Sequence, residues 1–276
     1  MIVLTMNNKG GVGKTTCALE LAAGYQLLCG RRVRGVDLDA GALELDGQLF
    51  HSGGSFLDWY RSRRQESRLQ VPVTAPAPNV VLTADELLES DQEGEQDVLV
   101  LDGPIALSRQ TIHALVAADL VLVPTRPAVL DLRATSNLLT PPAGGGRALL
   151  SLIADERARR GLRPQRVLCV LNQVDPHPLN QERRQCAELA KEAAIEMAPV
   201  LLTRRVAYPR AQAAGESVLT AFGWDRAAQE VAQLVATCER AHRGATAAEL
   251  AAAIERTAPG HEPHQVLKAM GVTAHA

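Results

Sequence analysis

The feature that most constrains this chain is a glycine-rich segment near its start, Lys9-Gly10-Gly11-Val12-Gly13-Lys14-Thr15-Thr16. It follows an apolar run at Ile2–Thr5 and precedes apolar residues spaced as on one helix face, between Ala18 and Leu28. Between a strand and a helix, glycines let backbone N–H groups converge on phosphate oxygens, and the helix N-terminus adds a favourable dipole. The segment therefore predicts a phosphate-binding loop.

The polar residues of this loop have distinct expected roles. Lys14 can reach the β and γ phosphates of a nucleotide, and the Thr15 hydroxyl can ligate Mg²⁺ directly. The plain phosphate-loop spacing is not met, because Asn8 stands where that pattern requires glycine, so the loop is a variant. The expected nucleotide-binding residues here are Gly10, Gly11, Val12, Gly13, Lys14, Thr15 and Thr16.

Short apolar runs alternate with helix-like stretches over residues 1–240. Unbroken apolar runs predict strands that are buried on both faces, and their alternation with helices predicts an α/β fold with a doubly wound, mostly parallel sheet. A helix is expected from Ser55 through Tyr60, and Gly30 is placed to end the first helix. The expected strands are Ile2–Thr5, Val33–Val36, Val80–Leu82, Val98–Leu101, Leu120–Val123, Val167–Leu171 and Pro199–Leu202.

Composition changes near residue 240. Residues 241–276 are rich in alanine and histidine and are interrupted by Pro259-Gly260, so we expect a partly helical tail outside a main domain at 1–240. Pro141 to Gly146 is expected to be a loop. The five cysteines form no Cys-x-x-Cys pair, and no apolar run approaches the ~18 residues of a membrane span, which favours a cytoplasmic protein.

Three motifs together resemble those of the ParA/MinD family of dimeric ATPases. The glycine-rich segment resembles the deviant Walker A box, Val36-Asp37-Leu38-Asp39 resembles the Asp-x-Asp of switch I, and Val98–Pro104 resembles Walker B with switch II. Leu171–Pro176 is similar to the family's adenine-side segment. The similarity spans about residues 1–240 and is greatest to ParA-type partition ATPases without an N-terminal helix-turn-helix.

The resemblance implies catalytic roles for three residues. Lys9 would reach across a nucleotide-sandwich dimer to the partner's phosphates, where charge building on the transferring phosphoryl group needs a positioned cation. Lys14 would act on the phosphates of its own protomer, and Asp39 would orient the attacking water.

It also implies ATP and Mg²⁺ as cofactors. Asp37 and Asp102 would hold Mg²⁺ through water, and Asn172 would hydrogen-bond the base. The switch segments depart from the family pattern, with Ala40-Gly41 in place of Pro-Gln and with Gly103 and Ile105 at switch II. These departures bear on the rate and the trigger of hydrolysis.

A net charge of −2 excludes a strongly basic nucleic-acid coat protein but not a local basic patch. Arg204, Arg205 and Arg210 lie in a stretch without acidic residues, Ala198–Gly215, which predicts contacts to DNA phosphates without base reading. The arginines at 61–68 and 157–166 are weaker candidates, and a solvated helix face accounts for such charge runs more often.

The resulting hypothesis is an ATPase whose ATP-dependent homodimer binds DNA nonspecifically, associates with the nucleoid, and segregates or positions a plasmid, chromosome or other large cargo. A ParB-like or other adaptor would stimulate hydrolysis. No membrane partner is expected, because the last 16 residues contain one lysine, no arginine and no sustained apolar stripe. Two alternatives remain open: a metabolic ATP-dependent ligase or reductase on the same fold, and an ATP-binding module with little turnover.

Overall fold

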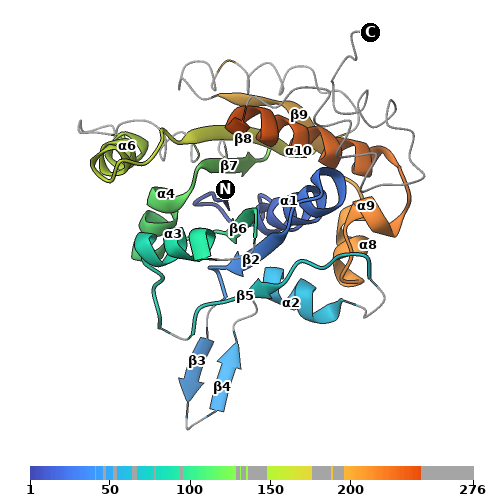
Figure 1. Cartoon of the computed structure of the whole chain (residues 1–276). Helices are drawn as coiled ribbons and strands as arrows, with labels where there is room; N and C mark the ends of the chain where they lie inside the picture. The colour runs from blue at the N-terminus through green and yellow to red at the C-terminus, as the bar shows by residue number, and fades with distance from the viewer. Residues whose placement is uncertain are drawn as a thin grey trace.

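Seven parallel strands form the central sheet, in the order β5-β2-β6-β1-β7-β8-β9 (Figure 1). They are β1 (Ile2–Thr5), β2 (Val33–Asp37), β5 (Val73–Thr74), β6 (Val98–Asp102), β7 (Leu120–Thr125), β8 (Arg166–Val174) and β9 (Met197–Thr203). A separate antiparallel pair consists of β3 (Ala42–Leu45) and β4 (Gln48–His51). The computed structural model describes residues 1–40, 42–45, 48–51, 55–63, 67–77, 79–93, 96–128, 131, 135, 148–175, 188 and 196–243.

Helices cover both faces of the sheet, as Figure 1 shows. One face carries α3 (Ala84–Glu93), α4 (Arg109–Ala117) and α6 (Leu149–Arg159). The other carries α1 (Lys14–Cys29), α2 (Ser55–Ser62), α8 (Ala207–Ala213), α9 (Val218–Ala221) and α10 (Arg226–Arg243). None of the helices in the described ranges is both long enough and apolar enough to cross a membrane.

The alternation of side chains along each strand explains the unbroken apolar runs. In β1, Val3 packs toward α1 and α10, whereas Ile2 and Leu4 pack toward α3 and α4. Because successive side chains point to opposite faces, a strand covered on both sides needs an apolar residue at every position. The predicted doubly wound parallel sheet is thereby confirmed.

One sequence prediction for this part of the chain needs correction. Val80–Leu82 is not a strand: Val80 and Val81 are 48% and 42% exposed, and the sheet edge is formed instead by β5, two residues long. A two-residue strand beside Pro72 is too short to be recognised by its pattern. The β3–β4 pair was also missed. Residues 141–146 and the tail beyond residue 243 lie outside the described residues.

Arg157, one member of the second arginine group, is buried and has a structural role. Its side chain is 2% exposed, and its guanidinium donates to the backbone carbonyls of Val116, Ala118 and Arg163 at 2.6–3.1 Å. It also lies 3.4 Å from an Asp119 carboxylate oxygen. Arg157 therefore fastens α6 to the α4–β7 turn and has no surface available for DNA.

We expect Arg157→Met to lower the free energy of unfolding by about 2–4 kcal/mol, because it leaves buried carbonyls without a donor. Arg159→Met is the matched control on the same helix. Arg159 is 73% exposed and pairs with Glu156 on the same helix, so its loss should cost less than about 0.5 kcal/mol. Urea unfolding of both variants measures the difference, and equal stabilities would contradict the structural role.

Candidate phosphate-binding site

The glycine-rich loop connects the end of β1 to the start of α1. Gly13 is the residue before α1 and adopts the left-handed conformation, with φ 93°. Because glycine has no side chain, it does not cap the first N–H groups of α1. A Cβ at this position would lie 1.9 Å from the Asn172 amide nitrogen, so both conformation and space require glycine. The first turn of α1 contains no acidic residue. Its N-terminus is therefore left free to receive an anion.

Thr15 and Asp102 meet at the centre of the site. The Thr15 hydroxyl donates to Asp102 Oδ2 at 2.6 Å, and the Asp102 side chain is completely buried at the end of β6. Burial raises the pKa of Asp102 to about 7, and the hydrogen bond from Thr15 opposes that rise. A hydroxyl beside a buried carboxylate offers the oxygen ligands that Mg²⁺ prefers, so these residues fit the metal that the motif implies.

Lys14 lies in the same loop, nearly buried. Its ammonium donates to the Lys9 carbonyl at 3.4 Å. Burial lowers the pKa of Lys14, and the charges of Asp102 and Asp39 oppose that lowering. Lys14 is thus close enough to both carboxylates to feel their charge, as expected for a phosphate-binding lysine at this position.

Asp37 is more constrained than its motif suggests. It lies opposite Asp102 in the β2–β6 register, and its side chain is fully buried. Its Oδ2 accepts the Phe56 and Leu57 N–H groups at 3.1 and 2.9 Å, and its Oδ1 accepts the Asp39 N–H at 3.1 Å. Burial raises its pKa, and these three hydrogen bonds oppose the rise.

The helix expected at Ser55 is confirmed, with Asp37 binding the first free N–H groups of α2. A carboxylate offers about four lone-pair positions, so Asp37 keeps about one for a metal-bound water. Asp39 is exposed beside it. The assignments of Asp37, Asp39 and Asp102 around Mg²⁺ stay predictions.

Position 103 departs from the family pattern, and the close approach of neighbouring backbone explains why it is glycine. Its N–H donates to the Thr5 carbonyl at 2.9 Å, and a Cβ at this position would lie 2.6 Å from that same oxygen. The backbone after β6 therefore approaches β1 too closely for a side chain. Ile105, two residues later, is 46% exposed.

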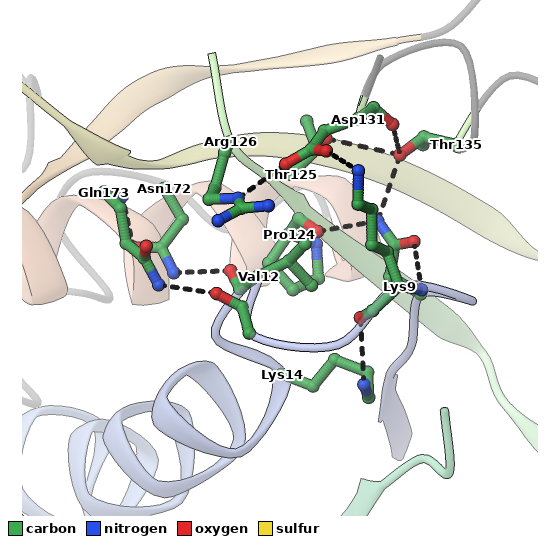
Figure 2. Close-up of polar contacts among 12 residues, drawn as sticks. Lys9, Val12, Lys14, Pro124, Thr125, Arg126, Asp131, Thr135, Asn172 and Gln173 are labelled. Carbon is green, nitrogen blue, oxygen red and sulfur yellow. Dashed lines mark hydrogen bonds and ion pairs between the residues drawn. The ribbon is translucent and has the colours of Figure 1, made fainter. Parts of the chain in front are cut away.

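Two amides from the end of β8 hold the outer side of the loop (Figure 2). Asn172 Nδ2 donates to the Val12 carbonyl, and Gln173 Nε2 donates to the Gly11 carbonyl, both at 2.8 Å. Gln173 adopts φ 56°, and its N–H donates to Asn172 Oδ1 at 2.8 Å. Asn172 was expected at the base; it lies against the loop, and its contact with a base stays a prediction. Gln173 was not foreseen.

Lys9 points away from α1, toward the segment after β7. Figure 2 shows its ammonium paired with Asp131, whose other oxygen accepts from Arg126 Nε at 2.5 Å. The Lys9 N–H donates to Asn7 Oδ1 at 3.1 Å. Neither Asp131 nor Arg126 was assigned a role from the sequence, because the pairing joins residues 122 positions apart.

A cavity of about 650 Å³ opens beside the loop. It is lined by Thr16, Asn172, Gln173, Thr203, Arg204, Arg205, Val206, Tyr208, Pro209 and Gln212. Gln212 Nε2 donates to the Thr16 hydroxyl at 2.9 Å, which links α8 to the start of α1. The volume is in the range of small-molecule sites.

Of the arginines predicted to bind DNA, Arg204 and Arg205 line this cavity and Arg210 lies on α8, and the three differ in their surroundings. Arg204 and Arg210 are exposed, whereas the Arg205 guanidinium donates to Glu230 at 2.8 Å and is 25% exposed. Glu230 also accepts from the Thr203 N–H and hydroxyl at 2.9 and 2.6 Å. The acid-free stretch in the sequence is therefore not acid-free in space, because α10 brings Glu230 to Arg205.

The family profile of the CobQ/CobB/MinD/ParA nucleotide-binding domain matches residues 3–218. The chain belongs to the ParA/MinD family. It is 30% identical over 241 residues to the maintenance of carboxysome distribution protein A of Halothiobacillus neapolitanus, which covers 83% of this chain and 92% of that one. The MinD cell division protein of Aquifex aeolicus has the same fold, with TM-score 0.57, 17% identity, and coverage of 87% and 95%.

Other relatives match over shorter stretches. The chromosome-partitioning ATPase Soj of Thermus thermophilus is 34% identical over 145 residues, which is 48% of this chain and 57% of Soj. A putative replication protein A of Sinorhizobium fredii is 29% identical over 177 residues, which is 50% of this chain and 42% of that protein. The chain thus spans about half the length of these two ParA/MinD relatives.

Asp102 gives this ParA/MinD site a testable pH dependence. A buried carboxyl with a pKa of about 7 keeps a proton that the unfolded chain releases near pH 4, so stability should fall as pH rises between these values. In EDTA at about pH 8, Asp102→Asn should therefore raise the free energy of unfolding by about 1–3 kcal/mol. Urea unfolding across pH measures this gain.

The gain should shrink below about 0.5 kcal/mol near pH 3, where the wild-type carboxyl is mostly protonated in both states. Asp85→Asn on α3 is the matched control, because the Asp85 side chain is 68% exposed. A gain that persists at low pH, or a loss of stability at high pH, would contradict the account.

Proposed function

We propose that this protein is a Mg²⁺-dependent ATPase of the ParA type, whose ATP-bound form is a sandwich dimer. The observation that carries the proposal is the loop itself, in which Lys9 and Lys14 are joined through the Lys9 carbonyl and Thr15 contacts Asp102. Two of the four lysines of the chain lie in this loop. A compact ammonium is well suited to a phosphate oxygen.

The reaction is phosphoryl transfer to water, which depends on positioning and electrostatic stabilisation. Lys14 binds the phosphates, the α1 N-terminus stabilises their charge, and Asp39 orients the water. The Thr15 hydroxyl would ligate Mg²⁺ directly, Asp37 and Asp102 would hold it through water, and the ion would neutralise charge on the phosphate oxygens. Lys9 supplies a further cation to the partner's nucleotide.

The cavity beside the loop is proposed to hold the base and ribose. It begins at Thr16, next to the phosphate-binding residues, and extends between the ends of β8 and β9 and the start of α8. Ligands of open α/β sheets bind outside the carboxyl ends of the strands, which is where this cavity lies. Asn172 and Gln173 form its boundary with the loop.

The cellular role is proposed to be the segregation or positioning of a plasmid, chromosome or other large cargo. Two relatives support this, since one is a chromosome-partitioning ATPase and another maintains carboxysome distribution. The ATP-bound dimer binds DNA nonspecifically, and an adaptor protein stimulates hydrolysis and release. Arg204 and Arg210, both exposed, are the leading candidates for phosphate contacts, and Arg205 contributes less because Glu230 engages it.

Random-sequence duplex DNA should bind the protein with ATP and Mg²⁺ but not with ADP, and the affinity should fall steeply with salt. Arg210→Ala should weaken binding equally for all sequences and reduce the salt slope by about one unit, because one phosphate contact is lost. Arg159→Met on α6 is the control of equal charge change. Fluorescence anisotropy across salt measures both, and nucleotide-independent binding would contradict the proposed cycle.

Lys9→Ala should leave the affinity for ATP within about threefold of wild type while abolishing ATP-dependent dimerisation and turnover, since an in-trans cation acts only in the dimer. Lys14→Ala should instead lower ATP affinity itself. Sedimentation with ATP and phosphate release measure these effects. A Lys9→Ala protein with full activity would rule out the sandwich dimer.

A further inference from the structure

Asp131 is a buried anion shared by two cations. Its side chain is 3% exposed, with one carboxylate oxygen on the Lys9 ammonium and the other on Arg126 Nε. Burial alone would raise the pKa of Asp131, but the hydrogen bonds from Arg126 and Lys9 hold it below its usual range. A carboxylate in this position therefore depends on both partners, since an unpaired buried charge is costly.

The two cations are less buried than the anion between them. The Lys9 side chain is 34% exposed and that of Arg126 is 40% exposed. Either can leave Asp131 and be solvated at modest cost, whereas Asp131 cannot follow, because its N–H donates to the Ala128 carbonyl and its own carbonyl accepts from Thr135. The anion is the fixed member of the three.

The Lys9 backbone is held, through Asn7, by Pro124 at the end of β7 and by Thr135 after it. Asn7 Oδ1 accepts the Lys9 N–H at 3.1 Å, while Asn7 Nδ2 donates to the Pro124 carbonyl at 2.9 Å and to the Thr135 hydroxyl at 3.0 Å. Lys9 is therefore attached through Asn7 to the end of β7 and, through its side chain, to Asp131 beyond that strand. In Figure 2 these contacts form one connected group on the side of the loop opposite Lys14.

We propose that Asp131 is a positioning residue that retains Lys9 within its own protomer, and that Arg126 sets the ease of its release. When Lys9 leaves, Arg126 stays on Asp131 and keeps the buried carboxylate paired. The retention of Lys9 by Asp131 follows from the contacts alone. Its consequence is that Lys9 is withheld from the partner's phosphates until the protein dimerises, and this consequence rests on the proposed function.

The two residues should have opposite effects on Lys9, which separates this proposal from a merely structural role. Asp131→Asn removes the charge that attracts the ammonium and should free Lys9. Arg126→Gln leaves Lys9 as the main partner of a buried carboxylate and should hold it more tightly. A structural role alone would make both substitutions loosen the segment in the same direction.

The chemical reactivity of Lys9 tests the retention without any nucleotide. The chain has four lysines, Lys9, Lys14, Lys191 and Lys268, so acetylation of each can be followed by mass spectrometry. An ammonium bound to a carboxylate must break that contact before it reacts. Relative to Lys268, the acetylation rate of Lys9 should rise about fivefold in Asp131→Asn and fall about threefold in Arg126→Gln, as charge-assisted hydrogen bonds of ordinary strength imply.

Asp131→Glu should keep Lys9 protected, and Asp85→Asn, an equal charge change on α3, should leave its rate unchanged. Unchanged labelling of Lys9 in Asp131→Asn would overturn the retention. Faster labelling in Arg126→Gln would overturn the role of Arg126, and this variant stays informative even if Asp131→Asn fails to fold, because Arg126 is partly exposed.

The consequence for the dimer is measured separately, by sedimentation at increasing ATP concentration. Asp131→Asn should dimerise at about fivefold lower ATP than wild type, and Arg126→Gln should need about threefold more, since release of Lys9 costs less in the first and more in the second. If labelling changes as expected while no protein dimerises with ATP, the retention stands and the proposed function fails. If wild type dimerises and the variants match it, the link between retention and dimerisation is wrong.

Discussion

The burial of negative charge at the carboxyl edge of the sheet is the constraint on which the site depends. Parallel register places Asp37 opposite Asp102, both fully buried, and the charge of Asp37 adds to the cost of ionising Asp102. Each is stabilised at the start of a helix: Asp37 accepts two N–H groups of α2, and Asp102 accepts the Thr15 hydroxyl of α1. The loop, α1 and α2 are thus positioned by the same two carboxylates.

The phosphate loop is fixed from its other side by neutral groups. Asn172 and Gln173 bind the carbonyls of Val12 and Gly11, and Asn7 fixes the backbone of Lys9. These contacts use amides and satisfy loop carbonyls without adding charge near the phosphate position. The buried carboxylates therefore position the helix starts on one flank of the loop, and the amides fix the loop backbone on the other.

Much of this could be predicted from sequence because the signals are local. The loop, the Gly30 helix end and six of the seven strands of the main sheet follow from short patterns within their own segments. What could not be predicted depends on distant pairing. Glu230 reaches Arg205 from α10, and Val73–Thr74 becomes a strand only because β2 offers an edge. No pattern within either segment encodes these contacts.

The different strengths of these contacts determine which parts of the loop can change when a ligand binds. The amide contacts of Asn172 and Gln173 are direct, at 2.8 Å, and face away from the lysines, so nothing in phosphate binding requires them to break. Among the described residues, the Lys14 ammonium makes a 3.4 Å contact to the Lys9 carbonyl, and a phosphate oxygen bound there would replace this contact with a stronger, charge-assisted bond. In the proposed function, phosphate binding at Lys14 would thus remove a contact to the Lys9 main chain while the Lys9 side chain still faces Asp131. The two lysines are therefore coupled through one carbonyl, and the loop can respond to a nucleotide without losing its fixed outer side.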